Sequence, residues 1–143
     1  MSDALRVKLL RTGARLPVRA TPAATGLDLH ACLDAPIEIG PDVTLVPIGI
    51  AIEAPVGFDV QVRPRSGLSR QGVNVILGTI DADYRGEILV SMHTFGSKQT
   101  HTVSDGDRIA QLVVSRFELV EVEAVQELSE SERGVGGHGS TGR

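Results

Sequence analysis

The clearest structural signal is the stretch Phe58-Asp59-Val60-Gln61-Val62-Arg63, in which apolar and polar residues alternate before Pro64-Arg65-Ser66-Gly67. Successive side chains of a β-strand point to opposite faces, so this alternation predicts a half-buried strand followed by a turn. Similar alternation predicts further strands over residues 5–9, 46–52, 88–92 and 120–122.

Turn sequences separate these runs at short intervals, and no stretch of ten or more residues keeps a helical period. Gly40-Pro41-Asp42, Pro55-Val56-Gly57 and Ser104-Asp105-Gly106-Asp107 are typical turns. We expect at most one short helical turn, near Ser66 to Gln71. The spacing predicts an all-β domain, a jelly-roll-like barrel or sandwich. Residues 109–114 are apolar apart from Gln111, so this strand is expected to be buried on both faces.

Length and composition limit the chain to one domain of ordinary size. The 143 residues are 41% hydrophobic but only 3% aromatic, so the core must come mainly from Val, Ile, Leu and Ala. The single cysteine, Cys32, excludes an intrachain disulfide and fits a reducing compartment. We expect Cys32 to be a small buried apolar residue.

Charge and hydropathy argue against several classes of partner. No run approaches the length of a membrane span, and the N-terminus lacks the apolar stretch of a signal peptide, so we expect a soluble, cytoplasmic protein without a membrane partner. A formal net charge of -4 argues against nucleic-acid binding, which requires a basic face. A single nucleotide needs only a few well-placed cations and stays possible.

The composition changes abruptly after residue 128. Residues 129–143 are rich in glycine and hydroxyl residues and almost devoid of apolar ones. Such a segment cannot offset its ordering entropy by burial, so we expect a β domain over 1–128 and a flexible arm over 129–143. Within the arm, Gly134 to Thr141 resembles a phosphate-binding loop but has Ser140 in place of its lysine. Glycine amides and Arg133 could still bind a polyphosphate.

Five segments combine glycine with charged or hydroxyl residues. Each alone has an ordinary structural explanation: Asp28 could cap a turn, Arg65 could be a surface cation, and Asp81 with Tyr84 could close a hairpin. The segments are 24–29, 64–68, 78–87, 106–111 and 133–142.

Two of these segments suggest specific chemistry. Arg65 and Ser66 follow a strand directly, where they could converge on an anion. Asp81 or Asp83, beside Tyr84, could deprotonate a water. The four histidines show no metal-ligand spacing, and no pairing of Ser, His and Asp suggests a nucleophile. A hard cation held by carboxylate, water and phosphate, with Mg²⁺ as the natural candidate, is the expected metal.

In this order and at these separations, the five segments resemble the five motifs of the homotrimeric dUTPase family over most of the chain. The most specific stretches are Gly78-Thr79-Ile80-Asp81-Ala82-Asp83-Tyr84-Arg85-Gly86-Glu87 and Arg133-Gly134-Val135-Gly136-Gly137-His138-Gly139-Ser140-Thr141-Gly142. The resemblance implies a jelly-roll-like subunit, a trimer with shared active sites, and Mg²⁺-assisted hydrolysis of dUTP to dUMP and pyrophosphate. That reaction limits uracil in DNA and supplies dUMP for thymidylate synthesis.

The resemblance also implies roles for single residues. Asp81 would position the attacking water, and Tyr84 would pack beneath the deoxyribose and exclude a 2′-hydroxyl. Backbone groups between Val75 and Leu89 would recognise uracil. Asp28 would act through Mg²⁺-bound water. The other implied substrate-binding residues are Thr79 and Ile80 for the base side, and Arg65, Ser66, Gly67, Gln111, Arg133, His138, Gly139, Ser140 and Thr141 for the phosphates and the closing arm.

Two features depart from the family pattern. His138 stands where an aromatic Phe usually stacks on the uracil, and an imidazole can gain a proton near neutral pH, so we expect weaker, pH-sensitive stacking. The connection between Gly72 and Asp81 is shorter than in many bacterial members. Which of Asn74, Val75 and Ile76 faces the uracil is therefore left open.

Two other classes of protein compete with this interpretation. A dCTP deaminase on a related fold would need an acid/base carboxylate at the amino-bearing carbon of cytosine, and the Tyr84 segment fits the uracil-selective pattern better. A non-enzymatic β-jelly-roll module would use the arm for docking. The presence of Asp81, Arg65 and Arg133 together weighs against that second alternative.

Overall fold

The computed structural model describes residues 3–139. Over that range the chain forms eleven strands and one short helix, which confirms the expected all-β class. The helix α1, Ser66–Arg70, lies where the sequence predicted a helical turn. The strands are β1 Arg6–Leu9, β2 Leu27–His30, β3 Ile37–Ile39, β4 Thr44–Pro47, β5 Ile50–Glu53, β6 Phe58–Arg63, β7 Val73–Val75, β8 Gly78–Ile80, β9 Leu89–Thr94, β10 His101–Val103 and β11 Arg108–Arg116.

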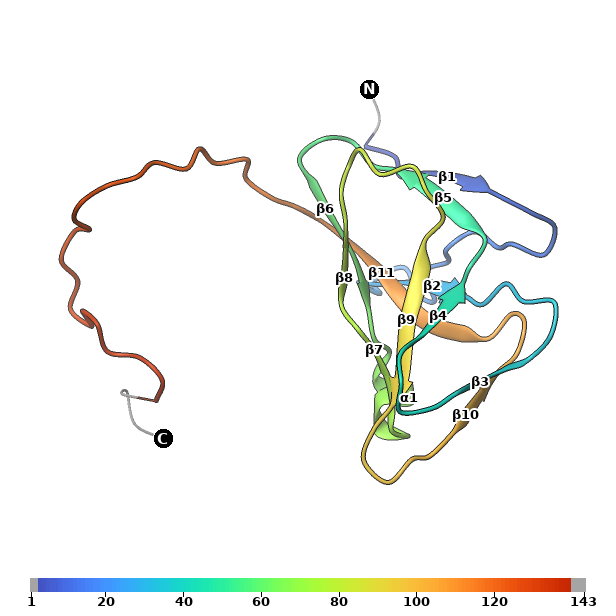
Figure 1. The fold of residues 1–143 in the computed structure, drawn as a ribbon. Helices are drawn as coiled ribbons and strands as arrows, with labels where there is room; N and C mark the ends of the chain where they lie inside the picture. The colour runs from blue at the N-terminus through green and yellow to red at the C-terminus, as the bar shows by residue number, and fades with distance from the viewer. Residues whose placement is uncertain (1–2, 140–143) are drawn as a thin grey trace.

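Two antiparallel sheets form the two layers of a jelly-roll-like body (Figure 1). One sheet has four strands in the order β2-β11-β6-β8, and the other has three in the order β4-β9-β7. Two ribbons, β1-β5 and β10-β3, extend the layers. No described helix is both long and apolar enough to cross a membrane.

The core lies between the layers and consists almost entirely of aliphatic side chains. This composition follows from the shortage of aromatic residues in the chain, because Val, Ile and Leu must fill the space. Cys32 is also buried, as expected. The largest fully buried side chains are Leu29, Ile39, Ile48, Ile50, Met92, Ile109 and Leu112.

The strand β11 joins the four-stranded sheet together. It pairs with β2 on one side and with β6 on the other, so both of its edges are hydrogen-bonded. Ile109 and Ala110 are buried in succession, and Leu112 and Val113 repeat that pattern. The prediction of burial on both faces is therefore confirmed, except that Val114 is partly exposed.

The predicted single strand over residues 46–52 is wrong, because the chain turns at Gly49. Gly49 has φ +71°, a left-handed conformation that glycine adopts at little cost. A Cβ atom there would lie 2.9 Å from Ala14 Cβ and 3.1 Å from Cys32 Sγ. The turn sends β4 to β9 and β5 to β1, so one alternating run supplies two strands of different sheets.

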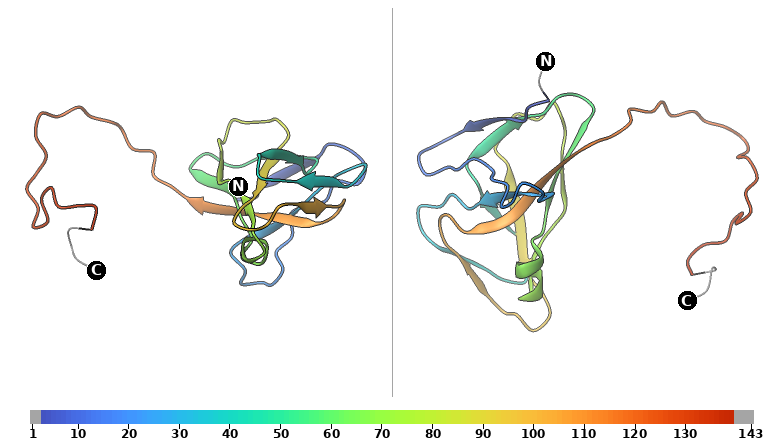
Figure 2. Two further views of the ribbon diagram at one scale, coloured as in Figure 1. Left: turned by 60° about the horizontal axis from the view of Figure 1, so that its bottom comes forward. Right: turned by 180° about the vertical axis from the view of Figure 1, so that it is seen from behind.

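The predicted strand at Val120 and Val122 is also wrong. The last strand ends at Arg116, and residues 117–139 contain neither helix nor strand. This extended segment leaves the body and includes the described part of the arm (Figures 1 and 2). Val122 is 96% exposed, because no strand among residues 3–139 pairs with this segment. Alternation alone does not make a strand without a hydrogen-bonding partner.

The expected hairpin around Asp81 forms only at its base. The arms β7 and β9 pair in register from Val73 opposite Thr94 to Val75 opposite Met92. Beyond that point the arms separate, because β8 pairs with β6 in the other sheet. The separation of β8 from β9 leaves space for a cavity between them.

A matched pair of leucine substitutions tests this core. Leu112 is fully buried in β11, whereas Leu16 lies in a loop and is 54% exposed. We expect Leu112→Ala to lower the free energy of unfolding by about 2–5 kcal/mol through lost burial and a residual cavity. Leu16→Ala should cost less than about 1 kcal/mol.

Denaturant unfolding at one protein concentration measures both effects, because the stability of an oligomer depends on concentration. Equal losses for the two variants would contradict the assignment of β11 to the core.

Candidate active site

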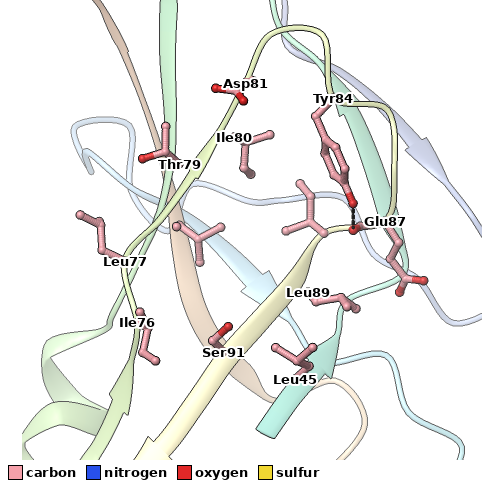
Figure 3. A pocket seen from close by; sticks show the side chains of 13 residues that line it. Leu45, Ile76, Leu77, Thr79, Ile80, Asp81, Tyr84, Glu87, Leu89 and Ser91 are labelled. Atoms are coloured by element: carbon pink, nitrogen blue, oxygen red, sulfur yellow. Dashed lines mark hydrogen bonds between the residues drawn. The ribbon is translucent and has the colours of Figure 1, made fainter. Parts of the chain in front are cut away.

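A cavity of about 380 Å³ lies where β8 separates from β9 (Figure 3). Its floor is aliphatic, and its rim carries Asp81 and Tyr84. Mostly apolar walls with a few polar groups are typical of small-molecule sites. The lining residues are Leu45, Val62, Ile76, Leu77, Gly78, Thr79, Ile80, Asp81, Tyr84, Glu87, Ile88, Leu89 and Ser91.

The segment from Asp81 to Glu87 folds back on itself at the rim. The Tyr84 amide donates to the Asp81 carbonyl at 3.0 Å, which closes a tight turn. The Tyr84 hydroxyl donates to the Glu87 carbonyl at 3.0 Å, so the ring lies directly over Gly86. A Cβ atom at Gly86 would lie 2.3 Å from that hydroxyl oxygen. Glycine is therefore required for the ring to occupy this position.

Arg85 stabilises the same turn from outside. Its guanidinium donates to the Ala82 carbonyl at 2.6 Å and to the Tyr84 carbonyl at 3.1 Å. It also forms an ion pair with Glu53 at 3.0 Å. Asp81 and Tyr84 are both exposed on the rim. The turn thus presents a carboxylate and a phenol ring to whatever occupies the cavity.

The structure brings most of the predicted base-side residues into this cavity. Thr79, Ile80 and Leu89 line it together with Asp81 and Tyr84. Val75 does not, because it is a buried residue of β7.

Sequence reasoning did not identify several other residues of the cavity wall. Ile76 and Leu77 form the two-residue connection from β7 to β8, and Ile76 was only one of three open alternatives. The shortness of this connection was the available signal, because it leaves both side chains beside the opening. Leu45 and Ser91 line the wall without a sequence signal that we can identify. Glu87 lies in the segment 78–87 that the sequence singled out, but no role was predicted for it.

A second group of predicted residues gathers around Asp28 at the other end of the sheet. The Asp28 carboxylate lies 3.5 Å from Arg65 Nε and 3.8 Å from Arg108 Nη1. Arg65 also donates to the Arg108 carbonyl at 3.0 Å. Because the two arginines outnumber the carboxylate, this Asp28 cluster is suited to an anion.

Gln111 holds the backbone of this cluster together. Its side-chain amide donates to the Pro64 carbonyl at 2.9 Å. It also lies against Gly26, where a Cβ atom would come within 2.0 Å of its Oε1 atom. Ser66 and Gly67 are exposed in the first turn of α1, where backbone N–H groups have no acceptor within the helix. The motif segments at β2, β6 and β11 therefore meet here.

His30, on the same strand as Asp28, does not add positive charge to the cluster at neutral pH. Burial lowers the pKa of His30, and Arg15 lowers it further. The Nδ1 atom of His30 has no hydrogen-bond partner within residues 3–139. The positive charge of the cluster therefore comes from its arginines.

The two groups lie at opposite ends of β6. Ile80 of β8 pairs with Val60 near the start of β6, whereas Arg65 follows its end. At about 3.3 Å per residue, the intervening five residues separate them by roughly 17 Å. Figure 1 shows the same arrangement, with α1 at one end of β6 and the connection from β8 to β9 at the other. An arginine side chain cannot span that distance within one chain.

The residues present limit how a metal could be held. Within residues 3–139, no three His, Cys, Asp or Glu side chains gather as a metal site. Asp28 offers one carboxylate, and two guanidinium groups already lie beside it. This donor set fits a hard cation only if phosphate and water supply most of the ligands.

The predicted arm residues lie away from both groups. Arg133 contacts its own segment, where its Nε atom donates to the Gly136 carbonyl at 2.5 Å. His138 is exposed and adopts φ 51°, and Gly139 adopts φ 90°. Ser140 and Thr141 lie outside the described residues.

Comparisons with known proteins show which family this chain is similar to. The dUTPase family model matches residues 12–142. The chain is 46% identical over 142 residues to the deoxyuridine 5′-triphosphate nucleotidohydrolase of Syntrophotalea carbinolica, with 96% of each chain covered. It is 45% identical over 146 residues to the protein of that name from Anaplasma marginale, covering 96% of this chain and 99% of the other.

A solved structure extends the agreement to the fold. The dUTPase of Staphylococcus bacteriophage 80alpha with dUpNHpp superposes with a TM-score of 0.85 at 27% identity, covering 99% of this chain and 100% of that one. The family match covers nearly the whole chain, and both relatives exceed 40% identity over most of their length. This chain therefore belongs to the dUTPase family.

Proposed function

We propose that this dUTPase hydrolyses dUTP to dUMP and pyrophosphate, with uracil and deoxyribose in the cavity beside Asp81. The main support for this proposal is the position of Asp81 and Tyr84 on the rim of an apolar cavity that is large enough for a nucleoside. Asp81 accepts a proton from a water molecule, whose oxygen attacks the α-phosphorus. The bond from that phosphorus to the bridging oxygen breaks, and pyrophosphate leaves. Removal of dUTP would limit uracil in DNA, and the dUMP formed would supply thymidylate synthesis.

The backbone of β8 accounts for recognition of uracil. β8 is the edge strand of its sheet, so one side pairs with β6 and the other side keeps free N–H and C=O groups. Thr79 and Ile80 both line the cavity, so the free backbone groups of this edge would form hydrogen bonds with the base edge. A fixed order of donors and acceptors favours uracil over cytosine, because cytosine presents an amino group where uracil presents a carbonyl.

Tyr84 accounts for selection of the deoxyribose. Its ring is held over Gly86 by the hydrogen bond to the Glu87 carbonyl, so it cannot withdraw easily. A sugar packed against this ring has no room for a 2′-hydroxyl. Ribonucleotides are therefore excluded by shape rather than by charge.

We propose that the complete site is shared among the subunits of a homotrimer. Arg65, Ser66, Gly67 and Gln111 would bind the phosphates of a nucleotide seated in a neighbouring subunit, because one chain separates them from Asp81 by roughly 17 Å. The arm over 129–143, with Arg133, His138, Gly139, Ser140 and Thr141, would close over the site from the third subunit. His138 would lie against the uracil.

Mg²⁺ is the cation that we propose for this reaction. Asp28 would accept hydrogen bonds from water bound to the ion, since its two arginine neighbours disfavour direct ligation. When bound with the triphosphate, the ion neutralises developing phosphate charge. We place the enzyme in the cytoplasm, because the buried free thiol of Cys32 suits a reducing compartment.

A substrate panel tests the reaction itself. Incubation with dUTP, dCTP, dTTP and UTP in the presence of Mg²⁺ should release pyrophosphate from dUTP alone. Asp81→Asn should lower turnover by about 10²-fold or more, because it removes the general base, while the affinity for dUTP stays nearly unchanged. Release from dCTP, or from none of the four, would overturn the proposed function.

Mixing two inactive variants tests whether the site is shared. Asp81→Asn and Arg65→Ala should each inactivate the trimer. If the two residues act from different subunits, co-refolded mixtures contain intact sites at a frequency of about one in four in a closed cyclic trimer. Pyrophosphate release in the mixture, compared with each variant refolded alone, measures this recovery. No recovery in a mixture shown to contain mixed trimers would place both residues in one chain.

Removal of residues 133–143 tests the arm. The described part of this segment makes its polar contacts within the arm, so its loss should leave the β domain folded. We expect the shortened chains to assemble as the full-length chains do. Turnover should fall by about 10²-fold, because closure excludes water and aligns the reacting groups. Light scattering and steady-state assays measure the two properties separately. Full turnover in the shortened protein would contradict the closing role.

A further inference from the structure

Glu87 contacts different partners through its backbone carbonyl and through its side-chain carboxylate. Its carbonyl accepts the Tyr84 hydroxyl, whereas its carboxylate contacts Arg11 and Gly49. Arg11 Nη1 and Nη2 donate to the two carboxylate oxygens at 3.1 and 2.9 Å, a bidentate arrangement. The Gly49 amide donates to Oε2 at 3.1 Å. Glu87 thus connects the rim of the cavity to the body of the domain.

The position of the Tyr84 ring depends on this connection. The hydroxyl forms its hydrogen bond only with the Glu87 carbonyl among the described residues, and the ring is 47% exposed. Packing alone therefore does not hold the ring in place. Figure 3 shows the hydroxyl directed at the Glu87 backbone. A shift of that carbonyl would move the ring with it.

The other end of the connection is rigid. The turn at Gly49 is closely packed against Ala14 and Cys32, as the short distances from a Cβ atom show. The Gly49 carbonyl also accepts the Leu10 amide at 2.8 Å, so the segment that carries Arg11 is fixed to the same turn. Glu87 is therefore anchored to a part of the body that cannot move easily.

The charges support the same arrangement at neutral pH. Hydrogen bonding from Arg11 lowers the pKa of Glu87, and the same pair raises the pKa of Arg11. Because its pKa is lowered, the Glu87 carboxylate stays ionised and paired at neutral pH and through the usual titration range of glutamate. The pair is lost only when the pH falls through the lowered pKa. Both side chains are partly exposed, at 40% for Arg11 and 28% for Glu87. Such a pair contributes little to global stability.

We propose that Glu87 and Arg11 are positioning residues that fix the Tyr84 ring against the sugar and so set the preference for dUTP over UTP. This inference rests on the sugar-excluding role of Tyr84 in the proposed function. Neither residue touches the reacting atoms. Their effect reaches the substrate through the Glu87 carbonyl and the Tyr84 hydroxyl.

Substrate preference gives the first test. We expect Glu87→Ala and Arg11→Ala each to lower the ratio of kcat/KM for dUTP to that for UTP by about tenfold, because a misplaced ring no longer excludes the 2′-hydroxyl. The double variant should lose no more than either single variant, as expected of residues that act as one unit. Arg11→Lys, which keeps the charge but not the bidentate geometry, should recover only part of the preference.

Tyrosine spectroscopy gives a second test that does not depend on substrate. Tyr84 is the only tyrosine, and the chain has no tryptophan, so near-ultraviolet circular dichroism and tyrosine emission report directly on this ring. Both spectra should change in Glu87→Ala. They should not change in Asp3→Asn, a control that removes an exposed ion pair of similar length to Arg116 at 2.8 Å.

The two tests separate the possible failures. If Tyr84→Ala keeps the preference for dUTP over UTP, the proposed role of Tyr84 fails, whereas the spectra still test the positioning. If Tyr84→Ala loses the preference while folded Glu87→Ala and the milder Glu87→Gln keep both preference and spectra, the positioning role is overturned. Thermal unfolding of each variant distinguishes these outcomes from a loss of fold.

Discussion

The pairing of β8 with β6, rather than with β9, is the constraint on which the site depends. β7 and β8 are joined only by Ile76 and Leu77, yet they belong to different sheets. The chain therefore crosses between the two layers within two residues. A closed hairpin would have paired β8 with β9 and left no cavity. Because β8 pairs elsewhere, its free edge and the facing side of β9 bound a space of nucleoside size.

The same sheet keeps the two groups of candidate site residues apart within one chain. β6 is paired on both edges, by β11 and β8, so it is a rigid element that fixes the separation of its two ends. The Asp81 turn lies at one end and the Asp28 cluster at the other. The first offers an apolar cavity with the Asp81 carboxylate on its rim, and the second offers two guanidinium groups. The rigidity of the sheet keeps these two surfaces apart within one chain. The proposal that one nucleotide is shared between subunits rests on that separation.

Sequence reasoning succeeded where the local signal was also the physical cause. The alternation from Phe58 to Arg63 predicted β6 because each apolar residue faces the core. Alternation failed over 46–52, since it records which face a side chain takes but not where the chain turns. At Gly49 the turn is imposed by contacts with residues distant in sequence. At Val122 the alternating pattern lacked a hydrogen-bonding partner, a property that no local pattern records.

The site shows the same limit at the level of single residues. Thr79, Ile80 and Tyr84 could be assigned because a short motif carries them. Glu87 closes that motif, but its carboxylate faces Arg11, which lies 76 positions away in the sequence. The group that holds the Tyr84 hydroxyl is its backbone carbonyl, which every residue type possesses. What distinguishes glutamate here is the anchor that holds this carbonyl in place, and an anchor of that kind becomes visible only when the fold brings the N-terminal segment beside the rim.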